Sequence, residues 1–190
     1  MTRYYLGALA LMAAVAGGNV LAAERDASLY VGVKSCKMCH RKAEDGEQFA
    51  KWQESAHAKA FEKLASPEAK EAAKKLGIDD PQKSGKCLAC HSTAYNWKDT
   101  VQNAELPVEE GVSCESCHGP GKNYKAKTVM KDKAQAKAAG LLDAKDSCIL
   151  CHNDKAPSWK ADRYTLKDGS KAGFDFEQAN AKIKHPMPKK

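Results

Sequence analysis

The cysteines constrain this chain most strongly, because all eight occur in four copies of one short motif. Each copy has the form Cys-x-x-Cys-His, as in "CESCH" at residues 114–118. Residues three and four positions apart share one face of a helix, so both thiols and the imidazole can reach the same flat cofactor. The pattern is typical of haem c, which the two thiols attach covalently while the histidine binds the iron.

A lone Cys-x-x-Cys pair also occurs in thiol oxidoreductases and in zinc half-sites. Neither chemistry requires a histidine directly after the second cysteine, yet all four pairs have one. We therefore predict four covalently bound haem c groups. The predicted attachment residues are Cys36, Cys39, Cys87, Cys90, Cys114, Cys117, Cys148 and Cys151, and the predicted proximal iron ligands are His40, His91, His118 and His152.

The first 22 residues have the three parts of a signal peptide. Arg3 precedes the apolar run "LGALALMAAVAGG", which is too short to span a bilayer, and small residues follow near Ala22. The alternative is a buried N-terminal helix. We predict a signal peptide at 1–22 and a single tetrahaem domain at 23–190, located in the periplasm or outside the cell and without a transmembrane segment.

The formal charge of +7 would by itself suit nucleic acid or an anionic membrane. Four haems bring eight propionates, on the order of −8, and this offsets the basic polypeptide. We therefore expect redox proteins as partners and no nucleic acid. The lysines between Lys122 and Lys133 form either a solvated face or a docking patch for an acidic redox partner.

Apolar periodicity and capping residues predict a mainly α-helical chain with long haem-wrapping loops. Ser66 and Asp175 are the predicted N-caps of two helices. No clear period exists over 153–173, and 92–111 is predicted to be loop with a short strand or two. The predicted helices span 43–64, 67–76, 129–139 and 176–183.

Histidines are too few to bind every iron on both faces. Four irons with two histidines each need eight, and the chain has six. At least two irons must therefore have another sixth ligand, or none. The two histidines outside the motifs, His57 and His185, are predicted to be distal ligands.

Methionine is the usual alternative ligand, and it raises the reduction potential relative to a second histidine. Met130 is the favoured methionine, because Met187 follows His185 too closely to reach a different iron with ease. Met38 lies inside its own motif and is expected to be filler. Lysine is a further alternative.

Four segments together resemble a known family. They are "KSCKMCHRKAEDGEQFAKWQESAHAKAFEKL", "CLACH", "GVSCESCHGPG" and "CILCHNDKAPSW". In this order they resemble the tetrahaem cytochromes c of ammonia oxidisers, which accept electrons from hydroxylamine oxidoreductase, and their multihaem relatives. The resemblance implies haems stacked in near-parallel and near-perpendicular pairs.

The resemblance also implies a ligand pattern. His57 would bind the third haem, that of His118, and His185 the fourth, that of His152. The second haem, at His91, would be five-coordinate, with "APSW" covering its open face. Family members have a histidine after the "GPG" turn that binds the first haem, but "GKNYKAKTVM" has none. Met130 is its nearest replacement, which implies His/Met ligation of the first haem.

Three functions are compatible with this pattern. The favoured one is a periplasmic electron carrier between a donor and an acceptor. The second is an enzyme that acts on nitric oxide, nitrite or hydroxylamine at an open second haem. The sequence offers no clear catalytic base beside His91 for this, and Tyr95 is the nearest titratable neighbour in sequence. The third is a subunit of a larger assembly with haems placed end to end, and the oligomeric state stays open.

Overall fold

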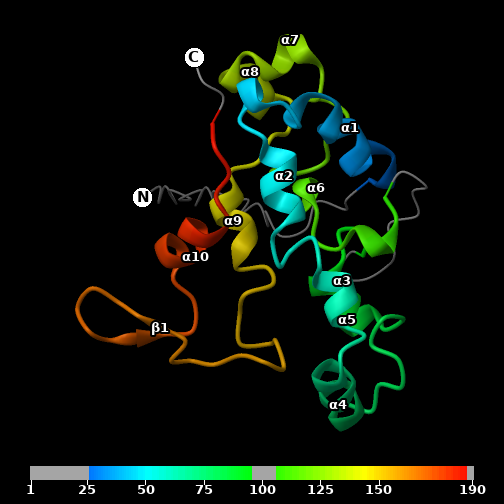
Figure 1. Ribbon diagram of the computed structural model, residues 1–190, viewed down its shortest axis with the longest axis vertical. Coiled ribbons are helices and arrows are strands. Elements are labelled where there is room, and N and C mark those ends of the chain that lie inside the picture. Colours follow the sequence, from blue (N-terminus) through cyan, green and yellow to red (C-terminus); the bar gives the residue numbers. More distant parts are fainter. Residues whose placement is uncertain (1–25, 96–105, 188–190) are drawn as a thin grey trace, which may run out of the picture.

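The computed structural model describes residues 26–95 and 106–187 of the chain, and this part is mainly helical, as predicted (Figure 1). The predicted signal peptide at 1–22 lies outside these residues, as do residues 96–105 of the loop predicted over 92–111. No helix in the described ranges is long and apolar enough to cross a membrane. The elements are η1 (Ala27–Leu29), α1 (Gly32–His40), η2 (Ala43–Asp45), α2 (Gln48–Gln53), α3 (Ala60–Lys63), α4 (Pro67–Lys75), α5 (Gly85–His91), η3 (Val108–Glu110), α6 (Cys114–His118), α7 (Lys127–Met130), α8 (Lys133–Ala138), α9 (Ala144–Cys148), β1 (Tyr164–Thr165), β2 (Lys171–Ala172) and α10 (Phe176–Ile183).

Helix α6 is central to the arrangement, because it packs against both α1 and α9. Helix α3 packs against α5, which carries the second motif. Figure 1 shows α4 at one end of the molecule and α1, α7 and α8 at the other. Strands β1 and β2 form an antiparallel hairpin that pairs Tyr164 with Ala172, and the sequence did not predict it.

The single helix predicted over 43–64 is wrong, because the chain leaves the helical path between α2 and α3. At this break the backbone carbonyl of His57 accepts a hydrogen bond from the amide of Val112 at 3.0 Å. Gly111 passes so close that a Cβ on it would lie 2.8 Å from the carbonyl oxygens of His57 and Ala58. Its φ of +64° also favours glycine. The "GVSC" segment thus binds the His57 carbonyl and packs against the Ala58 carbonyl, where a continuous helix would run.

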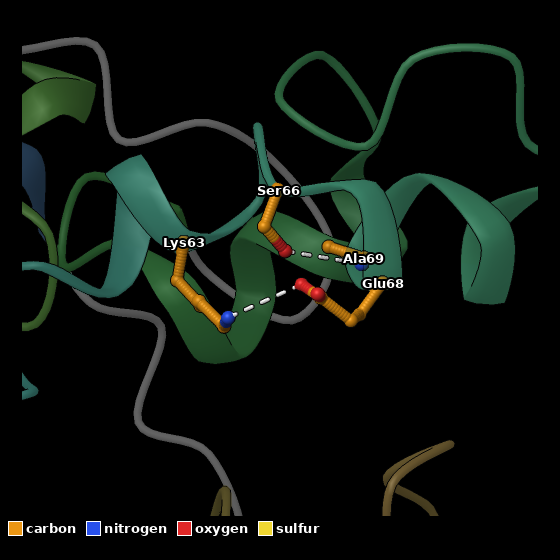
Figure 2. Close-up of polar contacts among 4 residues, drawn as sticks. All are labelled: Lys63, Ser66, Glu68 and Ala69. Carbon is orange, nitrogen blue, oxygen red and sulfur yellow. Dashed lines mark hydrogen bonds and ion pairs between the residues drawn. The ribbon is translucent and has the colours of Figure 1, made fainter.

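The predicted cap of α4 is confirmed. Ser66 Oγ accepts a hydrogen bond from the amide of Ala69 at 3.2 Å, and Pro67 occupies the first helical position (Figure 2). The Lys63–Glu68 ion pair beside it, at 3.4 Å, is exposed and contributes little. Gly77, with φ +68°, follows the end of the helix.

Of the two helices predicted in the second half of the chain, the one over 176–183 is confirmed and the one over 129–139 is wrong. Asp175 caps α10 by accepting a hydrogen bond from the amide of Gln178 at 2.9 Å. The helix predicted over 129–139 is divided into α7 and α8, because Asp132 leaves the helical conformation and caps α8. Its Oδ1 accepts hydrogen bonds from the amides of Ala134 and Gln135 at 2.9 and 3.0 Å.

The buried carboxylate of Glu115 joins three segments of the fold. Glu115 is only 1% exposed, although it lies inside the third motif. Its Oε1 accepts hydrogen bonds from the amides of Val31 and Gly121 at 3.0 and 2.6 Å, and its Oε2 accepts one from Gly32 at 2.9 Å. A Cβ on Gly121 would lie 2.8 Å from the Val31 side chain, so the turn needs glycine there. Glu115 thereby fixes α6 against the start of α1.

We predict that Glu115→Ala destabilises the holoprotein strongly. The substitution leaves three buried amides without their acceptor, which should lower the free energy of unfolding by about 3 kcal/mol or more. Urea denaturation followed by circular dichroism measures this quantity. Glu44→Ala removes an exposed carboxylate paired only with Lys42 and serves as the control, which should be nearly silent. Equal effects of the two substitutions would show that the Glu115 hydrogen bonds do not organise the fold.

Candidate haem-attachment sites

Three motifs present their cysteines and histidine from helices, and the fourth does so from a helix end and the turn after it. The first three lie within α1, α5 and α6. The fourth begins in α9, and the helical pattern continues past it, because the amide of His152 donates to the carbonyl of Cys148 at 2.9 Å. All eight cysteines are free thiols. This arrangement fits the attachment of one flat cofactor per motif.

The cysteines and histidines are not arranged as zinc sites. Among the residues that the structure describes, no three His, Cys, Asp or Glu side chains gather closely enough to hold a metal ion. A structural zinc site requires four such ligands around one point. The donor sets therefore fit four separate haem groups better than ions held by the polypeptide alone.

Two motif histidines are oriented through Nδ1. His91 Nδ1 donates to the backbone carbonyl of Ala60 at 2.7 Å, so its Nε2 keeps a free lone pair for a metal. His40 Nδ1 lies 3.2 Å from Gln48 Oε1. The Gln48 amide donates to the carbonyls of Asp45 and Pro186, which leaves Oε1 to accept from His40. In both rings Nε2 is thus left available to bind a metal.

The two histidines outside the motifs each face a motif histidine. The ring centres of His57 and His152 lie 6.0 Å apart, and those of His118 and His185 lie 5.8 Å apart. Two imidazoles on opposite sides of one metal ion have ring centres about 6 Å apart, since each metal–nitrogen bond is about 2 Å long. His185 Nδ1 is buried and has no hydrogen-bond partner among the described residues. Both pairs therefore fit an iron between them.

The partners are the reverse of those implied by the family resemblance. His57 faces the fourth motif rather than the third, and His185 faces the third rather than the fourth. The break between α2 and α3 places His57 beside His152. The C-terminal segment packs against Gly46 and Gln48, and the Pro186 carbonyl accepts a hydrogen bond from the Gln48 side-chain amide at 3.0 Å. This contact brings His185 to His118.

Burial keeps these histidines in the form that binds metals. It is the main cause of the lowered pKa of His57, His118 and His152. The facing histidine is the second cause for His57 and His118. A lowered pKa favours the neutral imidazole, whose free nitrogen is the donor that a metal requires.

Contacts between thiols place the motifs in a definite spatial order. Cys151 donates a hydrogen bond to Cys90 and lowers its pKa to about 7, so the second and fourth motifs touch. Burial, and after it the nearby Cys148, raise the pKa of Cys117 to about 11, which places the third motif beside the fourth.

The first motif completes this order. A hydrogen bond from Cys114 lowers the pKa of Cys36, so the first and third motifs touch. The order in space is therefore second, fourth, third, first. The two facing histidine pairs belong to the two inner motifs. In the described part of the chain, neither His57 nor His185 is paired with His40 or His91 of the outer motifs.

The structure shows where the methionines and the "APSW" segment lie, but it does not test their predicted roles at the haems. Met130 is half-buried at the end of α7, and its ligation stays a prediction. Met38 and Met187 are 67% and 78% exposed. In the "APSW" segment, the Trp159 ring packs against Gly173, and covering of the second haem by this segment stays a prediction.

Two residues of these sites had no signal in the sequence. Phe174 stacks on the His152 ring, with centres 5.4 Å apart and planes at 15°. Gln48 is buried between His40 and the C-terminal segment. A single Phe or Gln in a polar stretch carries no periodicity, and these contacts depend on chain segments that are distant in sequence.

Three comparisons with known proteins found similar chains. The family model described as "Cytochrome c554 and c-prime" matches residues 35–119, which contain the first three motifs and His57. Cytochrome c-554 of Nitrosomonas europaea is 30% identical over 190 residues, covering 88% of this chain and 77% of the relative. The structure of the reduced state of cytochrome c554 from Nitrosomonas europaea covers 80% of this chain and 77% of that chain, at 26% identity and a TM-score of 0.47.

We predict that the facing histidines can be assigned by combining substitutions. His57→Ala should convert one low-spin iron to high-spin, which electron paramagnetic resonance detects. In a Cys148→Ala/Cys151→Ala background that retains three haems, His57→Ala should add no high-spin iron, because the fourth haem is already lost. His185→Ala should add one in both backgrounds. The opposite pattern would restore the pairing implied by the family resemblance.

Proposed function

The chain belongs to the cytochrome c554 family of electron-transfer c-type cytochromes and carries four covalently bound haem c groups, and from this premise we propose that it is an exported carrier between two redox proteins. The observation that carries the proposal is the pair of facing histidines at each inner motif, with ring centres 5.8 and 6.0 Å apart. A bis-histidine iron has no position left for a substrate. The inner sites are therefore suited to electron transfer alone.

The haem irons supply one-electron redox chemistry, and their potentials depend on axial ligands, hydrogen bonds and burial. The residues of this chain set those conditions. The motif cysteines would hold the groups, and His40, His91, His118 and His152 would bind the irons. The carbonyl of Ala60 and the amide of Gln48 fix the orientation of His91 and His40. On the inner sites His57 and His185 bind from the other side.

The shortage of histidines falls on the two outer motifs. For the first motif we propose Met130 as the distal ligand of the His40 iron. For the second motif we propose that the His91 iron stays five-coordinate. Because a second imidazole favours the ferric state and a thioether favours the ferrous state, the inner irons should have lower potentials than the first iron.

We place the protein in the periplasm. The support is the pattern of Arg3, an apolar run and small residues up to Ala22, together with haem c attachment, which takes place outside the cytoplasmic membrane. The mature protein would then be the domain at 23–190. Its electron donor and acceptor would be met in the same compartment.

The enzyme alternative requires chemistry at the second motif. The Tyr95 ring lies against Gly85, at the start of α5, whereas His91 is the last residue of that helix. Tyr95 is therefore positioned to pack the helix rather than to exchange protons at an open face of the His91 iron. This placement favours electron transfer over catalysis.

A redox titration with turnover assays tests the proposed function. We expect the holoprotein to take up four electrons reversibly in an optical titration and to show no sustained turnover of nitric oxide, nitrite or hydroxylamine. Stoichiometric oxidation or reduction without turnover is the result of a carrier. Sustained turnover that is lost in a variant of the second motif alone would establish the enzyme alternative instead.

We predict that Met130 is visible in the near-infrared spectrum of the oxidised protein. Sulfur bound to ferric haem produces a weak charge-transfer band, which Met130→Ala should abolish. Met130→His should give a third bis-histidine iron and lower its potential, since the second imidazole stabilises ferric iron. Met187→Ala is the matched control and should leave the band unchanged. A band that is lost only in Met187→Ala would transfer the ligand role to the C-terminal segment.

A further inference from the structure

The four motifs differ in how far their intervening residues are exposed. In the second and third motifs one intervening residue is buried, with Leu88 4% and Glu115 1% exposed, and the other, Ala89 or Ser116, is half-buried. In the first motif Met38 is 67% exposed, and Cys39 is the exposed one among the eight cysteines. The part of the first motif that would hold the haem therefore lies at the protein surface. The corresponding parts of the second and third motifs are less exposed.

Lysines surround this exposed edge. Lys34 and Lys37 lie on α1 and are exposed. The segment with Lys122 and Lys125 lies beside the start of α1, because the amide of Lys122 donates to the carbonyl of Leu29 at 3.0 Å and Glu115 binds both segments. We call this area the motif-1 surface, defined by Lys34, Lys37, Met38, Lys122 and Lys125.

The charge of this end of the molecule is predominantly positive. Lys127, Lys131 and Lys133 extend it over α7 and α8, which Figure 1 shows at the same end as α1. Nearby carboxylates have partners within the protein. Glu115 and Glu110 accept hydrogen bonds from backbone amides at the start of α1, Asp132 caps α8, and Glu44 pairs with Lys42 at 3.3 Å. Asp26 lies near Lys122 and accepts a hydrogen bond from the amide of Ser28.

We propose that the motif-1 surface is the docking site of an acidic electron-transfer protein, which rests on the proposed carrier function. An exposed apolar side chain within a charged rim is typical of transient interfaces. A partner with carboxylates around its own redox centre complements this rim and is steered toward it. One electron then passes between the two proteins, so that one is oxidised as the other is reduced.

The exposed part of the fourth motif does not match this partner. Ile149 and Leu150 are 60% and 37% exposed there. The surrounding residues are of mixed charge, with Asp143 and Asp146 beside Lys145. In the motif order the fourth site is also an inner one, whereas the first lies at the end. Charge and position therefore both select the first motif.

Stopped-flow reduction by flavodoxin hydroquinone, an acidic redox protein, tests the proposal. The double variant Lys34→Glu/Lys37→Glu should lower the second-order rate constant about tenfold or more at low ionic strength. The difference should shrink as salt is added, because exposed charges are screened. Lys70→Glu/Lys74→Glu on α4, at the other end of the molecule, changes the net charge equally and should alter the rate by less than about twofold.

Three results would overturn the docking site. They are an equal slowing by the α4 variant, a slowing by Ile149→Glu with none by the α1 variant, or a wild-type rate constant that does not depend on salt. Lys34→Arg/Lys37→Arg keeps the charge and should keep the rate. Each variant must carry four haems and be fully reducible by dithionite. If the wild-type protein itself does not carry four haems that dithionite reduces, the result contradicts the proposed carrier function and not the docking site.

Discussion

The packing of α6 against both α1 and α9 is the contact on which the rest of the molecule depends. Glu115 fixes one side of it, since a single buried carboxylate binds the amides of Val31, Gly32 and Gly121. On the other side, Ser147 Oγ donates to the carbonyl of Cys117 at 3.1 Å. The third motif is thereby held between the first and the fourth. The order of the first, third and fourth sites follows from these contacts.

The small apolar core explains why such polar contacts matter. The buried cluster around Tyr30, Ala94 and Leu106 is modest for a chain of this length. Four haem groups must complete the interior, so the polypeptide mainly positions their attachment helices. Short helices joined by hydrogen-bonded turns serve this purpose better than long ones. The break that directs His57 toward His152 is an example.

The motif spacing was sufficient to predict the cofactors, because thiol attachment requires a fixed local pattern, and apolar periodicity with capping residues predicted the helical class. Ser66 and Asp175 were also predictable, since capping depends on neighbours in sequence. The histidine partners were not, because they depend on where distant segments meet. Gly111 closes against the carbonyl of His57, and Pro186 binds Gln48, and neither contact has a local signal. Family resemblance alone gave the opposite pairing.

The histidine count links this geometry to function. Six histidines can complete two irons, and the structure places both complete pairs at the inner sites. The two ends are then free to differ in ligand, potential and exposure. We propose that this difference between inner and outer sites serves a protein that exchanges electrons at its ends and conducts them through its centre.

The electron paramagnetic resonance spectrum of the fully oxidised holoprotein tests this account most directly, because it counts irons by their axial ligands. The account predicts two bis-histidine irons per chain and two irons of other kinds, one of them high-spin. His57→Ala and His185→Ala should each remove one bis-histidine signal. A spectrum without bis-histidine irons, or one that neither substitution changes, would contradict the central claim.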